Sequence, residues 1–71
     1  MQILLNGEPH EVMAPAVGGG VTLGHLVATL GLVGRRLAIE VNQELVPRSE
    51  HSSFRLAPGD RVEIVQAIGG G

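Results

Sequence analysis

The sequence predicts an α+β domain in which one short helix packs on one face of a mixed β-sheet. Helical periodicity of apolar residues is found in the middle of the chain, at residues 22–31, and alternating β-type segments lie on both sides of it. The 71 residues contain 44% apolar residues, which is enough for one small core. Because the chain has no cysteine, this core depends on packing alone.

The N-terminal segment predicts a β-hairpin. Residues 2–6 alternate Ile3 and Leu5 against Gln2, Leu4 and Asn6, and Asn6 with Gly7 supplies the two left-handed residues of a type I′ turn. The return strand, residues 8–13, contains Pro9, which has no N–H to donate. We therefore expect this strand at the edge of the sheet.

A glycine-rich connector at residues 14–21 leads to the predicted helix. Its triple glycine is not followed by the lysine and hydroxyl residue of a phosphate-binding loop. Thr22 is a suitable N-cap, and Gly31 stands where a left-handed residue ends a helix. The apolar stripe between them consists of Leu23, Leu26, Val27 and Leu30. A helix this short is marginal alone, so we expect it to lie on the sheet.

The second half of the chain completes the sheet. In order, it predicts a strand at 37–41, a turn at 42–44, an extended piece at 45–48, a loop or helical turn at 49–53, a brief strand at 54–56 and a final strand at 61–67. Pro58 and Gly59 fit the central positions of a type II turn. The first and last strands are the most apolar, so we expect them side by side in the centre. Periodicity alone leaves other topologies open.

Composition and charge argue against several classes of function. The net charge is −2 with scattered arginines, which gives no basic stripe for nucleic acid. No apolar run approaches the ~20 residues of a membrane helix, and the first residues do not resemble a signal peptide. We therefore expect a cytoplasmic protein. His10, His25 and His51 lack ligand spacing, so we predict solvated histidines and no metal site.

The chain as given ends on three glycines directly after a β-type run. We expect residues 1–67 to form the domain and residues 68–71 to form a flexible tail, since glycine orders at a high entropic cost. An arm without side chains can enter a narrow cleft and present its α-carboxylate to a partner. The alternative is a frayed tail without a role.

Four sequence blocks occur in register along the chain: Ala38-Ile39-Glu40-Val41-Asn42, Val46-Pro47-Arg48, residues 58–65 and the terminal glycines. Together these blocks resemble the ThiS family, the sulfur carriers of thiamin biosynthesis. This resemblance covers nearly the whole chain. It implies a β-grasp (ubiquitin-like) fold with four to five strands, and Gly71 as the reactive terminus paired with Gly70. Residues 65–68 lack the phenylalanine and paired prolines typical of molybdopterin-type carriers, which favours the thiamin branch.

The same resemblance implies the chemistry and the partners. An adenylating enzyme of the ThiF type, using ATP and Mg²⁺, would activate the Gly71 carboxylate, which is ionised at neutral pH. A sulfur donor such as a desulfurase would then form a thiocarboxylate, and a thiazole synthase of the ThiG type would take the sulfur. The chain itself would bind no cofactor and would be a co-substrate, not an enzyme. The alternatives are a ubiquitin-like protein modifier, a molybdopterin-type sulfur carrier and a passive binding module.

Strand alternation also predicts a partner-binding surface. If Ile3 and Val62 point towards the helix, period-2 alternation turns their neighbours to the opposite face of the sheet. The expected docking residues are Leu4, Val65, Ala67, Ile68 and Gly69. Scattered surface aliphatic residues are the alternative reading. Arg48, after Pro47, is either a further docking contact or a solvated side chain at a turn.

Overall fold

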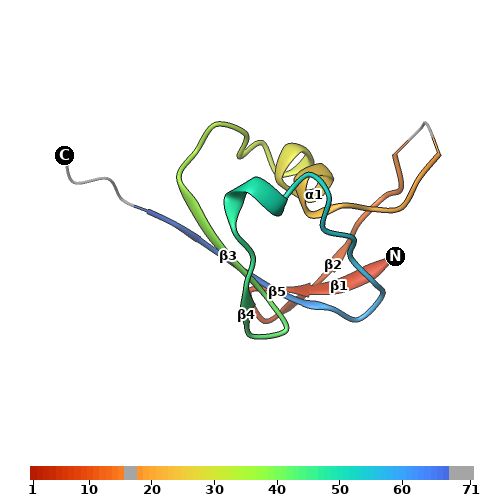
Figure 1. The fold of residues 1–71 in the computed structure, drawn as a ribbon. Helices are drawn as coiled ribbons and strands as arrows, with labels where there is room; N and C mark the ends of the chain where they lie inside the picture. Colours follow the sequence, from red (N-terminus) through yellow and green to blue (C-terminus); the bar gives the residue numbers. More distant parts are fainter. Residues whose placement is uncertain (16–17, 68–71) are drawn as a thin grey trace.

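The computed structural model describes residues 1–15 and 18–67 and shows a five-stranded sheet with one α-helix on one face (Figure 1). The elements are β1 (Gln2–Leu5), β2 (Glu8–Glu11), α1 (Leu23–Thr29), β3 (Leu37–Val41), β4 (Glu44–Leu45), the 3-10 helix η1 (Arg48–Glu50) and β5 (Arg61–Gln66). The strand order is β2-β1-β5-β3-β4, in which only β1 and β5 are parallel. The predicted β-grasp, α+β class is confirmed, with five strands. The predicted tail, residues 68–71, lies outside the described residues.

The N-terminal hairpin has the predicted geometry. Asn6 and Gly7 both take positive φ values, of 50° and 84°, as a type I′ turn requires, and Leu5 pairs with Glu8 across the two-residue loop. β2, which carries Pro9, lies at the outer edge of the sheet. The missing N–H of the proline therefore interrupts no central ladder.

The parallel pair of β1 and β5 joins the two ends of the domain. The Leu4 N–H donates to the Asp60 carbonyl, and the Asn6 N–H donates to the Val62 carbonyl, each at 2.9 Å. The side-chain oxygen of Asn6 also accepts the Ile64 N–H at 2.9 Å. The first and last strands are thus side by side, as predicted, and β5 occupies the centre of the sheet.

Both ends of α1 are closed by the predicted caps. The Thr22 hydroxyl accepts the His25 N–H at 3.1 Å. At the other end, Gly31 has a φ of 73°, and its N–H donates to the Ala28 carbonyl at 3.0 Å. The following N–H, of Leu32, reaches back to the Val27 carbonyl at 3.0 Å. These two bonds make a Schellman motif, which satisfies carbonyls that the helix end leaves free.

The core lies between α1 and the helix-facing side of the sheet. The fully buried side chains come from the helix, from three strands and from the residue after β2: Leu23 and Leu26 from α1, Ile3 from β1, Ile39 from β3, Val62 from β5, and Val12. Leu5, Leu30, Leu32 and Ile64 pack against this cluster from its border. The predicted apolar stripe of the helix is therefore the centre of the core.

The predicted strand at residues 54–56 is wrong. The structure has a single bridge between Thr22 and Arg55 instead. In this segment, the Phe54 carbonyl accepts the Leu23 N–H and the Leu56 N–H donates to the Val21 carbonyl, each at 2.8 Å. The segment therefore pairs with the residues at the entry to α1 and not with a strand of the sheet.

Other boundaries also differ slightly from the prediction, since β2 ends at Glu11 and β5 ends at Gln66. Glu44 is already paired with Val41 in β4, so the turn consists of Asn42 and Gln43 alone, both at positive φ. The segment at 49–53 takes the helical alternative, since η1 begins at Arg48. None of these differences changes the sheet order.

We predict that Leu26→Ala lowers the free energy of unfolding by about 2–5 kcal/mol, because Leu26 is 0% exposed and its removal leaves a cavity. Leu45→Ala is the matched control, since Leu45 is 67% exposed and should change stability by less than about 0.5 kcal/mol. Chemical denaturation measures both. If the two variants lose similar stability, the helix stripe is not the core.

Candidate functional site

The candidate site begins on the face of the sheet that α1 does not cover. Ile3 and Val62 are buried towards the helix. Leu4 is one residue from Ile3 and Val65 is three residues from Val62, so both lie on the open face, as the alternation predicts. Leu4 is half-buried and Val65 is 63% exposed. Ala67 follows the end of β5 and is exposed. That these residues bind a partner stays a prediction.

The structure does not bring the predicted docking residues into one patch. Leu4 pairs with Arg61 at the start of β5, whereas Val65 pairs with Ala38 near its end. Four residues of β5 separate these positions, which is about 13 Å along a strand. Val65 therefore lies near the start of the predicted tail, while Leu4 lies at the far end of the same face.

Two negatively charged side chains lie on the open face between its Leu4 end and its Val65 end. Glu40 of β3 and Glu63 of β5 lie directly opposite each other on the open face, and both are exposed. Such cross-strand neighbours have Cβ atoms roughly 4.5–5.5 Å apart, and like charges there are destabilising. Among residues 1–15 and 18–67 the only ion pair joins the amino group of Met1 to Glu11, at 2.9 Å, so neither glutamate has a cationic partner in this part of the chain. Arg61 lies on the same face two residues from Glu63, but neither glutamate is ion-paired with it, so the two carboxylates suit a partner that presents a cation.

The approach to the predicted reactive terminus is anchored to the sheet. Leu37 pairs with Gln66, the last residue of β5, and the Ala67 N–H donates to the Arg36 carbonyl at 2.9 Å. The chain is thus held in register as far as Ala67. The remaining predicted site residues, Ile68, Gly69, Gly70 and Gly71, lie outside the described residues.

Two of the three histidines, His25 and His51, have structural partners, which corrects the expectation that these two are simply solvated. His25 Nε2 donates to the Met13 carbonyl at 2.8 Å, and His51 Nε2 donates to the Val46 carbonyl at 3.1 Å. Both side chains are half-buried, as is that of His10 on the edge strand. Each bond ties a loop to a neighbouring element, which a periodicity argument does not reveal.

The described residues hold no group of three histidine, aspartate or glutamate side chains that could bind a metal ion. In the same part of the chain, neither helix has the length and apolar character needed to cross a membrane.

The ThiS family model matches residues 3–71 of this chain. The fold also matches a solved structure, that of the thiamine biosynthesis protein ThiS from Geobacter metallireducens. That match covers 100% of both chains with a TM-score of 0.77 and 25% sequence identity.

Curated relatives match the full length of the chain. Two are named thiazole synthase, from Paramagnetospirillum magneticum (37% identical) and Magnetococcus marinus (39% identical). The chain spans only 20% of the length of these two relatives. An uncharacterized protein of Porphyra purpurea is 34% identical, and the chain covers 93% of it.

We predict that the Glu40–Glu63 pair reduces the stability of the isolated domain. A double-mutant cycle with Glu40→Gln and Glu63→Gln should show a repulsive coupling of about 0.2–1 kcal/mol that shrinks at high salt. Chemical denaturation at low and high ionic strength measures it. Glu44→Gln, on the exposed strand β4, is the control and should show no coupling to Glu63. An attractive coupling would show that the two carboxylates are not neighbours.

Proposed function

Because this chain belongs to the ThiS family, we propose that it is a sulfur carrier of thiamine biosynthesis and that the Gly71 carboxylate carries the sulfur. The observation that supports this most is that the family match extends over residues 3–71, through the predicted reactive pair of glycines. The full-length fold match to a thiamine biosynthesis protein supports the same pathway. We place the carrier in the cytoplasm.

The proposed reaction uses the chain as a co-substrate and not as an enzyme. A carboxylate oxygen of Gly71 attacks the α-phosphorus of ATP and pyrophosphate leaves, which gives an acyl adenylate. Hydrosulfide from the donor then attacks the carbonyl carbon, and AMP leaves as the thiocarboxylate forms. If the donor carries the sulfur as a persulfide, the attack gives an acyl disulfide, and a second thiol of the partner cleaves its S–S bond, which leaves the thiocarboxylate on Gly71 and a disulfide on the donor. This chain supplies the nucleophile and the arm. A ThiF-type adenylating enzyme supplies ATP, Mg²⁺ and the positioning of the reacting atoms.

The proposed acceptor of the sulfur is a thiazole synthase of the ThiG type. In two relatives, a segment similar to this chain forms part of a longer protein named thiazole synthase. A carrier and the enzyme that uses its cargo gain a high effective concentration when one polypeptide contains both. Those relatives therefore support a thiazole synthase as the partner here.

The open face of the sheet is the proposed docking surface for the adenylating enzyme. Val65 and Ala67 lie where the chain leaves the sheet, and Ile68 with Gly69 would continue this contact towards the reactive pair. The acidic pair, Glu40 and Glu63, lies in the middle of this face, with Glu63 two residues before Val65 on β5. A partner with an arginine or lysine opposite the two glutamates would remove their repulsion on binding. Charge complementarity of this kind would fix the orientation in which the arm enters the enzyme.

We predict that Leu4→Arg with Val65→Arg weakens binding to the adenylating enzyme at least about tenfold while the fold stays intact, because both side chains are on the open face. The matched control is Met13→Arg with Val33→Arg, two residues that are 73% and 71% exposed elsewhere. Titration calorimetry gives the affinities. Since Leu4 and Val65 are at opposite ends of the face, the two single variants show which end matters. Equal affinities for the double variant and the control would remove this face from the proposal.

The terminus itself is tested by intact-protein mass after incubation with the adenylating enzyme, ATP and a sulfur source. We predict that the protein mass increases by the difference between one sulfur and one oxygen atom, and that fragmentation locates this increase at Gly71. Deleting Gly71 shortens the reach by about 3.3–3.6 Å and should abolish the gain. Gly70→Val should block it through bulk and restricted backbone freedom, with the free energy of unfolding unchanged. A parent chain that gains no sulfur, or a Gly71-deleted chain that gains it equally well, contradicts the proposal.

A further inference from the structure

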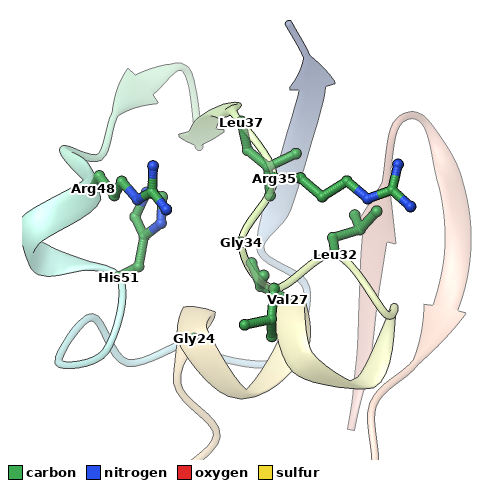
Figure 2. A pocket seen from close by; sticks show the side chains of 9 residues that line it. Gly24, Val27, Leu32, Gly34, Arg35, Leu37, Arg48 and His51 are labelled. Carbon is green, nitrogen blue, oxygen red and sulfur yellow. The ribbon is translucent and has the colours of Figure 1, made fainter.

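A hollow on the helix side of the molecule has two walls of different character. It has a volume of about 210 Å³ and lies between α1, the connection at residues 32–35, the start of β3 and η1. Figure 2 shows Arg48 and His51 on one wall, with the apolar side chains of Val27 and Leu37 across from them. The hollow is on the side of the sheet that carries α1, so it is separate from the open face described above.

The basic wall has no anionic partner among the described residues. Arginine is charged at any physiological pH. In residues 1–15 and 18–67 the one ion pair joins Met1 to Glu11, and the described lining of the hollow contains no acidic side chain. His51 Nε2 is occupied by its bond to the Val46 carbonyl, which holds the ring in place. Arg48 is therefore the main donor available to a bound anion.

The rim adds charge and apolar area. Arg35 also lines the hollow, but Figure 2 shows its side chain running past Leu32 and away from Arg48. Val33, beside it, is 71% exposed. A ligand that fits here would combine a negative group with an aliphatic part.

The volume limits the kind of ligand. Pockets for whole small-molecule ligands measure about 300–1,000 Å³, so this hollow suits one or two side chains instead. We propose that it binds an acidic side chain of a partner protein, a glutamate or aspartate next to an apolar residue. The carboxylate would pair with the guanidinium of Arg48, whose planar fork matches it in bidentate fashion. The apolar neighbour would lie against Val27 and Leu37. This site is independent of the sulfur-transfer proposal, because it uses the other side of the molecule.

The test is an NMR titration of the ¹⁵N-labelled chain with the peptide acetyl-Ala-Leu-Glu-Leu-Ala-amide. The control peptide has glutamine in place of glutamate. We expect saturable shifts at the amides of Val27, Leu37 and His51, and no shifts at Leu4 and Val65. The glutamate peptide should bind about threefold to tenfold more tightly than the control, the range between an exposed ion pair and a charge-assisted hydrogen bond.

Matched arginine variants identify the anion-binding group. Arg48→Gln should lose about the same threefold to tenfold, and Arg48→Lys should lose less, because it keeps the charge without the fork. Arg36→Gln is the control, since Arg36 is exposed and outside the lining, and it should bind within about twofold of the parent. The proposal is overturned if no saturable shifts occur, if the glutamine peptide binds equally well, or if Arg36→Gln weakens binding as much as Arg48→Gln. It is also overturned if inorganic phosphate alone binds as tightly as the glutamate peptide, because the hollow would then be a general oxyanion site.

Discussion

The parallel pairing of β1 with β5 is the constraint on which the rest of the structure depends. It brings together segments that are 58 residues apart where the Asn6 side chain accepts the Ile64 N–H. Parallel strands cannot be joined by a tight turn, so the chain between them must cross over one face of the sheet, and here that crossover includes α1. The same pairing puts β5 in the centre, where one set of its side chains meets the helix and the other set faces outwards.

In this arrangement the two faces of β5 differ: side chains on one face stabilise the core, and side chains on the other face are available to a partner. Val62 is buried under the helix, whereas Glu63 and Val65 are exposed on the other face. Because the helix side supplies the core, the open face can carry features that do not stabilise the isolated domain, such as the like-charged pair of Glu40 and Glu63. Departures of this kind from local stability are typical of functional surfaces. The central strand also leads, through Ala67, to the residues proposed to carry the sulfur.

Local signals in the sequence were sufficient where the backbone conformation decides the structure. Asn6 and Gly7 predicted their turn, and Thr22 and Gly31 predicted both helix ends, because each residue fits a conformation or a capping bond that others satisfy poorly. The predicted strand at 54–56 failed for a different reason: a β-type pattern of three residues does not show whether a free sheet edge is within reach.

The features that the sequence analysis missed depend on pairing between segments that are distant in the sequence. The opposition of Glu40 and Glu63 depends on the register between β3 and β5, and the partners of the histidines are carbonyls in other segments. The resemblance to the ThiS family supplied the overall topology and the proposed terminus, which periodicity could not.

Growth of a strain that lacks this chain, on medium without thiamine, tests the sulfur-carrier account most directly. We predict that the strain needs added thiamine or its thiazole part, and that the parent chain, but not the Gly71-deleted chain, removes this need. Rescue by the Gly71-deleted chain, or growth without either supplement, would contradict the account.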